Sequence, residues 1–135
     1  MNKEQLLQDL IIDEGLRTEI YYCTEGVPTI GVGRNLERGI SKDEALYLLT
    51  NDLNMVETEL DARLAWWRGL PDDAQRGLAN ICFNIGYPSL AKFVIALGYL
   101  EEREFDKAAD EFLDSNWANQ VGQRATRVTD LIRNA

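Results

Sequence analysis

The sequence is poor in cysteine, in long hydrophobic runs and in positive charge, and each shortage excludes a class of protein. Its two cysteines, Cys23 and Cys82, do not make a disulfide framework and suit a chain made in a reducing compartment. No apolar run approaches the roughly 18 residues that a membrane-spanning helix requires. The first residues, MNKEQLLQDL, lack the basic-then-apolar order of a secretory signal. We therefore expect a soluble chain made in the cytoplasm, which something else must export if it acts elsewhere.

The shortage of positive charge argues against a nucleic-acid partner. Lysine and arginine number 14 against 23 acidic residues, which gives a net charge of −9. Binding to phosphate backbones depends on the opposite excess. The charge is uneven, because the segment 115–135 carries Arg124, Arg127 and Arg133 against Asp130 alone. This segment could meet an anionic polymer locally, or it could be an ordinary solvated helix face.

The chain has the composition of one folded domain. It holds 135 residues, of which 45% are hydrophobic and 27% charged, and it contains no repeat or linker. An apolar stripe predicts a first helix that begins after Asn2 and ends at Gly15. Residues 17–24 and 28–34 are typical of two strands joined by a hairpin turn. Gly31 and Gly33 alternate in the second strand, which indicates either the close approach of a ligand or another chain segment, or simple packing.

The remainder of the sequence is helical. The stretch Ser41-Lys-Asp-Glu44 is a capping box that opens a long amphipathic helix. Further helices are expected at 71–86, at 89–100 with a break near Gly98, at 105–113 and at 117–132. The expected fold is α+β: a small N-terminal β-hairpin lobe, a larger helical bundle, and a cleft between them. The single domain 1–135 would divide into a hairpin lobe, 16–40, and a helical lobe, 1–15 with 41–135.

Three residues around the hairpin are candidates for catalysis. Glu14 ends the first helix, Cys23 follows after eight intervening residues, and Thr29 after five more. A glutamate facing a hairpin has the position of a general acid in a glycosidase, which needs a second group on the other face of the sugar. The alternatives stay open at this point, because Glu14 could be a surface residue and Cys23 a small buried hydrophobic one.

Sequence motifs around these residues, and further along nearly the whole chain, resemble those of one protein family. The stretches "IDEGLR", "IYYCTEGVPTIGVGR", "ISKDEA", "FNIG" and "SNWANQVGQRATRV" are similar, in order, to lysozymes (endolysins) of the T-even bacteriophage type, glycoside hydrolase family 24. The catalytic pattern of that family is Glu, eight residues, Asp or Cys, five residues, Thr. Glu14, Cys23 and Thr29 match it in spacing and in residue type.

The resemblance implies a lysozyme-like fold and a muramidase, which cuts the β-1,4 bond between N-acetylmuramic acid and N-acetylglucosamine in peptidoglycan. Glu14 would protonate the leaving oxygen, Thr29 would hold the attacking water, and Cys23 would orient that water or take its proton. A thiol is also a nucleophile, so attack by Cys23 on the sugar, with retention of configuration, stays open. Arg124 would pair with the catalytic glutamate. Phe83 would line the sugar groove, or it would be core.

The resemblance also implies a monomer that needs no cofactor or metal, with peptidoglycan glycan strands as its partner. It would not insert stably into a membrane. It would act in the periplasm, after release by a separate holin or export route, to lyse the host cell. This sequence departs from the family at Arg34, where relatives often carry histidine, in the short loop 35–40, and in its acidic charge. Two rivals remain: a lytic transglycosylase using Glu14 alone, and a non-catalytic module that binds peptidoglycan.

Overall fold

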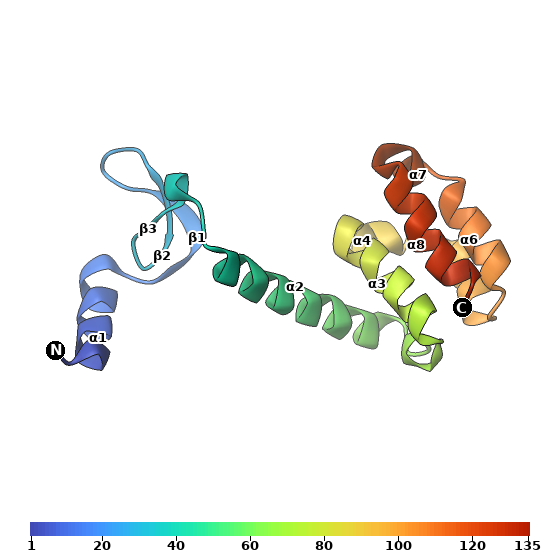
Figure 1. Cartoon of the computed structure of the whole chain (residues 1–135), viewed down its shortest axis with the longest axis horizontal. Helices are drawn as coiled ribbons and strands as arrows, with labels where there is room; N and C mark the ends of the chain where they lie inside the picture. Colours follow the sequence, from blue (N-terminus) through green and yellow to red (C-terminus); the bar gives the residue numbers. More distant parts are fainter. The chain divides into compact units, whose positions relative to one another are not determined.

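The computed structural model describes all 135 residues, which form two compact units, Met1–Tyr47 and Leu48–Ala135. Figure 1 shows the order of the elements along the chain. The boundary between the units falls inside the longest helix, α2 (Lys42–Arg63). The fold is α+β, as expected, with a small antiparallel sheet and a majority of helix. The finer division into lobes 16–40 and 1–15 with 41–135, and the cleft between them, stay predictions.

The N-terminal unit opens with helix α1 (Lys3–Glu14), whose two ends follow the sequence signals. The Asn2 side-chain oxygen accepts a hydrogen bond from the Gln5 backbone N–H, which satisfies one of the free donors of the first turn. Gly15 ends the helix with a φ of +77°, a conformation that glycine adopts without steric cost. Glu14 is therefore the last helical residue, immediately before the sheet.

The sheet has three strands in the order β1 (Arg17–Tyr22), β2 (Pro28–Gly31) and β3 (Arg34–Asn35). The first hairpin forms as predicted, with Tyr21 opposite Thr29. The prediction of one strand over 28–34 was wrong, because the chain turns at Val32 and Gly33 and returns as β3. Positive φ angles at Gly31 and Gly33 allow this second, tighter turn.

Helix α2 begins with the predicted capping box. The Glu44 backbone N–H donates to Ser41 Oγ at 3.1 Å, and the Ser41 N–H donates to Glu44 Oε1 at 3.0 Å. These bonds, together with the nearby Arg34 guanidinium, hold the pKa of the Glu44 carboxyl below its ordinary value. The bond between Arg34 Nη1 and Glu44 Oε2, at 2.6 Å, ties β3 to the start of α2. A short 3-10 helix, Leu36–Arg38, lies between them.

The C-terminal unit is a bundle of short helices after α2. A 3-10 helix, Trp67–Gly69, precedes α3, and the order from there, followed by colour in Figure 1, is α3 (Asp72–Ile85), α4 (Tyr87–Leu90), α5 (Val94–Glu101), α6 (Phe105–Leu113), α7 (Asn116–Val121) and α8 (Gln123–Arg133). Helices α3 and α6 both pack against α8. No helix has the length and apolar character to cross a bilayer.

Two of the expected helices are each divided. The break expected near Gly98 lies instead at residues 91–93, and Gly98 is inside α5. That break allows the Phe93 ring to pack on Phe112, with ring centroids 5.1 Å apart. The expected helix 117–132 is also two helices, because Gly122, with a φ of +61°, turns the chain between α7 and α8.

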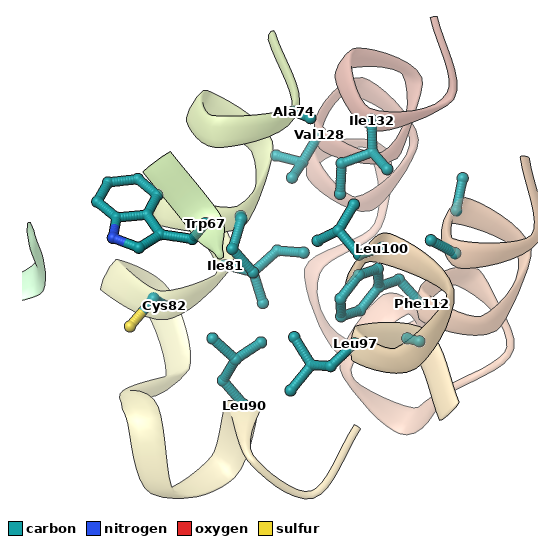
Figure 2. Packing of buried hydrophobic residues seen from close by; sticks show 14 of the residues in the cluster. Trp67, Ala74, Ile81, Cys82, Leu90, Leu97, Leu100, Phe112, Val128 and Ile132 are labelled. Atoms are coloured by element: carbon teal, nitrogen blue, oxygen red, sulfur yellow. The ribbon is translucent and has the colours of Figure 1, made fainter. Parts of the chain in front are cut away.

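The hydrophobic core of the C-terminal unit is continuous across its helices. Figure 2 shows side chains such as Ile81 of α3, Leu97 of α5 and Phe112 of α6 directed into one cluster. Gly77 lets α3 approach α8 closely, since a Cβ atom there would lie 2.7 Å from Ile132 Cγ1. This packing fixes the faces of α3 and α8 that carry the polar residues described below.

Candidate functional site

The structure places Glu14 against the second turn of the sheet. Its side chain is exposed, and a Cβ atom added to Gly33 would lie only 2.9 Å from Glu14 Oε2. The absence of a side chain at Gly33 therefore makes room for the carboxylate. Gly31, by contrast, has open space at the same position. Of the two explanations for the alternating glycines, the close approach of another chain segment holds for Gly33, and that segment is Glu14.

Cys23 and Thr29 lie close together around one backbone carbonyl. The Cys23 backbone N–H donates to the Val27 oxygen at 3.1 Å, and the Thr29 hydroxyl donates to the same oxygen at 2.9 Å. Thr29 is only 5% exposed, whereas Cys23 is half-buried and free of any disulfide. Val27 was not predicted to matter, because the role of a backbone carbonyl leaves no mark on residue type. All three predicted catalytic residues thus belong to the N-terminal unit.

The hydroxyl of Thr29 has a fixed hydrogen-bonding direction. A hydroxyl carries one hydrogen and two lone pairs, and the hydrogen of Thr29 is committed to the Val27 carbonyl. Toward any further ligand, Thr29 Oγ1 therefore acts as an acceptor. It can take a hydrogen bond from a water molecule and so orient the lone pairs of that water.

The second cysteine has different surroundings. Cys82 is 3% exposed in the core of the C-terminal unit, and burial, with a smaller effect of the nearby Glu59 charge, raises the pKa of its thiol. A buried neutral thiol acts as a small hydrophobic group. The sequence pattern assigned chemistry only to Cys23, and that assignment stays a prediction.

The two predicted supporting residues share a pocket within the C-terminal unit. This pocket of about 580 Å³ is lined by Arg124 and Phe83, with apolar residues such as Leu53 and Trp67. Phe83 is 41% exposed, so it lies at the surface and is not core. The pairing of Arg124 with Glu14, and the contact of Phe83 with a sugar, stay predictions.

Within its unit, Arg124 is held by an asparagine. Arg124 Nε and Nη2 donate to Asn80 Oδ1 at 3.1 Å and 2.9 Å, across 44 residues of sequence. One helical turn further along α3, Asn84 Oδ1 accepts a hydrogen bond from the indole N–H of Trp117 at 2.8 Å. Trp117 is buried. Our sequence interpretation missed both asparagines, although an asparagine pair inside an apolar helix is a signal, because asparagine is a weak helix former.

No group of histidine, cysteine, aspartate or glutamate side chains in the structure is arranged to hold a metal ion. The N-terminal unit holds an acid at the end of α1, and a thiol and an oriented hydroxyl on the adjoining hairpin. These are groups that a glycoside hydrolase could use to activate water.

The comparisons with known proteins give the family. Residues 12–133 match the phage lysozyme family, and the chain belongs to it. Membership makes it a lysozyme-class glycoside hydrolase. The matched range includes every candidate site residue, from Glu14 to Arg124.

The individual relatives are distant. The chain is 28% identical over 149 residues to the pre-baseplate central spike protein Gp5 of Enterobacteria phage T4, which covers 89% of this chain but only 26% of the spike protein. It is 26% identical over 154 residues to the probable T4-type lysozyme 2 of Dictyostelium discoideum, covering 90% of both chains. It is also 26% identical over 150 residues to the probable T4-type lysozyme 1 of that organism, covering 89% and 88%. The chain thus spans about a quarter of the spike protein but most of each lysozyme.

Proposed function

We propose that this protein is a muramidase that hydrolyses the β-1,4 bond between N-acetylmuramic acid and N-acetylglucosamine in peptidoglycan. The observation that carries the proposal is the placement of Glu14, which ends α1 with its carboxylate against the side-chain-free turn at Gly33. An exposed carboxyl group at this position is accessible to a glycan and can donate a proton to the leaving oxygen.

The hairpin supplies the second half of the reaction. Thr29 Oγ1 accepts a hydrogen bond from the attacking water, because its own hydrogen is committed to Val27. Cys23, half-buried beside it, orients this water or takes its proton. Water attack on the face opposite the leaving group inverts the anomeric carbon. If the Cys23 sulfur attacked instead, a covalent sugar–thiol intermediate and retention would result.

We also propose the biological setting that the family resemblance implies. The protein acts as a monomer on glycan strands of the cell wall, after synthesis in the bacterial cytoplasm and release to the periplasm by a separate membrane-permeabilising protein. Lysis of the host cell is the outcome. A phage spike protein contains a region that is 28% identical to this chain, so a similar sequence also occurs inside a longer protein.

The test is the substitution Glu14→Gln, which keeps the shape but removes the acidic proton. We expect the release of reducing ends from purified peptidoglycan to fall at least about a hundredfold, the scale of a lost general acid. Folding should be unchanged, because Glu14 is exposed and makes no ion pair within the N-terminal unit. Asp13→Asn is the matched control, since Asp13 is an exposed carboxylate in the same helical turn. Nearly full activity in folded Glu14→Gln protein would refute the proposal.

A further inference from the structure

Arg124 is held by a neutral side chain and not by a carboxylate. Arg103 also donates to a neutral oxygen, the backbone carbonyl of Gly69, but through a single N–H group. Five arginines form ion pairs with carboxylates of their own unit: Arg34, Arg63, Arg68, Arg76 and Arg133. Within the C-terminal unit, Arg124 has no carboxylate partner, yet two of its N–H groups bind one neutral carboxamide oxygen. Its guanidinium is thus fixed in place while its positive charge has no ion-pair partner within that unit. In a chain of net charge −9, such an arrangement is conspicuous.

The two hydrogen bonds also fix which atom of Asn80 faces the arginine. Only the carboxamide oxygen can accept, so Oδ1 points to Arg124, and the Nδ2 group is left with two unused donors. A guanidinium carries about five N–H donors, so about three remain after the bonds to Asn80. Both residues line the same pocket as the exposed ring of Phe83. The pocket therefore combines unused N–H donors, a cation that has no ion-pair partner within its unit, and an apolar ring. Two carboxylates, Glu57 and Asp72, and two further arginines, Arg68 and Arg76, also line it.

We propose that Asn80 is a positioning residue, which fixes the Arg124 guanidinium without cancelling its charge and keeps that cation available to oxygen groups of a glycan bound in this pocket. The inference rests on the proposed function, because the ligand it names is the glycan. It explains why residue 80 is an asparagine and not an aspartate. An aspartate would accept the same two hydrogen bonds more strongly, but it would neutralise the arginine.

The shape of α3 supports a fixed position for the pair. Gly77 lies one turn before Asn80 on the face that packs against α8, where the helices touch so closely that a Cβ atom would meet the Val128 carbonyl oxygen at 3.1 Å. The short helix-to-helix distance brings the carboxamide of Asn80 within reach of Arg124 on α8. The positions of both side chains therefore depend on a rigid, well-packed interface.

The experiment compares Asn80→Asp, Asn80→Ala and the wild type in three measurements. Thermal unfolding reports stability, release of reducing ends from purified peptidoglycan gives kcat and KM, and NMR titration with a short N-acetylglucosamine–N-acetylmuramic acid oligomer reports binding without turnover. Asn51→Asp is the matched control, because it adds the same charge at an exposed position of α2.

We expect Asn80→Asp to keep or raise the unfolding temperature while its kcat/KM and its affinity for the oligomer fall by roughly tenfold or more, as for a misplaced or neutralised contact. Asn80→Ala should lose function with a small loss of stability, and Asn51→Asp should match the wild type. If Asn80 had a purely structural role, the opposite result would be expected. Asn80→Asp preserves both hydrogen bonds to Arg124, so that variant would then stay fully functional.

The outcomes separate this inference from the proposed function. A wild type that binds the oligomer but releases no reducing ends would contradict the muramidase proposal, and the binding measurements would still test Asn80. Wild-type function in Asn80→Asp would overturn the role of Asn80 whatever the reaction. Loss of stability together with function in Asn80→Asp would overturn it as well, since the two hydrogen bonds would then not explain the choice of asparagine.

Discussion

The contact between Glu14 and Gly33 permits a test in which one alanine is compared with another. Gly33 and Gly31 both have positive φ angles, +68° and +70°. Alanine at either position therefore carries a similar backbone penalty, about 1–2 kcal/mol for a non-glycine residue in the left-handed region. The two positions differ in what the new methyl group meets. At Gly31 nothing lies within 4 Å, whereas at Gly33 the methyl carbon would lie 2.9 Å from Glu14 Oε2.

The clash sets the size of the expected effect. Ordinary van der Waals contact begins at 3.4 Å, so the carboxylate in Gly33→Ala must move by about 0.5 Å. A displacement of this size is close to the largest positional error that a catalytic group can have without loss of rate. A shift of about 1 Å can reduce a rate roughly a hundredfold. We expect Gly33→Ala to hydrolyse peptidoglycan about tenfold more slowly than Gly31→Ala, with the same loss of stability in both.

The assay is the initial rate of reducing-end release, measured beside thermal unfolding of the same two proteins. Each variant is compared with the other and not only with the wild type, so the shared backbone strain cancels. Equal rates in Gly33→Ala and Gly31→Ala would refute the reasoning, because the position of the Glu14 carboxylate would then not control activity. A slower Gly31→Ala protein would refute it too.

Three further predictions concern the core, the acid stability and the thiol. Gly77→Ala should destabilise the C-terminal unit by about 1–3 kcal/mol, because the new methyl group clashes with Ile132. Gly98→Ala has open space around it inside α5, so it should stabilise the same unit by roughly 0.5–1 kcal/mol. Denaturant unfolding measures both effects. Hydrogen bonds from Arg68, and secondarily from Trp67, hold the pKa of the Asp61 carboxyl below its ordinary value. The ionised Asp61 carboxylate therefore contributes its full stabilisation above about pH 4, and this stabilisation is lost as the pH falls through the lowered pKa. Acid unfolding curves of Asp61→Asn should accordingly be flatter than those of the control Asp52→Asn, and identical curves would contradict this assignment. Cys23→Asp should stay active and Cys23→Ala should lose most activity, with the α-anomer as the first product by NMR; a β-anomer with a trapped sugar–thiol adduct would instead make Cys23 the nucleophile.

Local signals in the sequence predicted the elements around the site well. These signals are hydrogen bonds and backbone turns that span only three or four residues. The structure confirms the cap at Asn2, the helix end at Gly15 and the capping box from Ser41 to Glu44. Glu14 was placed correctly at a helix end because that end depends only on its neighbour, Gly15. Such short-range features are independent of the rest of the fold.

The errors lie where tertiary packing decides between local alternatives. Gly98 weakens a helix by propensity, but the buried side chains of Leu97 and Leu100 hold α5 together around it. The break at residues 91–93 instead allows the aromatic contact between Phe93 and Phe112. Gly122 stands in an otherwise helical pattern, and only its left-handed φ reveals that the chain turns there.

The residues of the site could be predicted from the sequence, but the contacts between them could not. Motif spacing singled out Glu14, Cys23 and Thr29, since residue type and short-range order are visible in the sequence. The link between Cys23 and Thr29 through the Val27 carbonyl is a backbone contact and has no residue signature. The hold of Asn80 on Arg124 joins positions 44 residues apart, and it depends on the close packing of α3 and α8. Periodicity within one helix does not reveal such a pair.

The chemical form of the products tests the central claim most directly. Purified peptidoglycan is digested with the wild-type protein, and the new glycan ends are identified by mass spectrometry. Hydrolysis by a muramidase predicts N-acetylmuramic acid at the reducing end with the elements of water added. Ends that are one water lighter, as 1,6-anhydro sugars, would show a transglycosylase that uses Glu14 alone. Absence of any new ends would show a module that binds without cleaving, and either result would contradict the account.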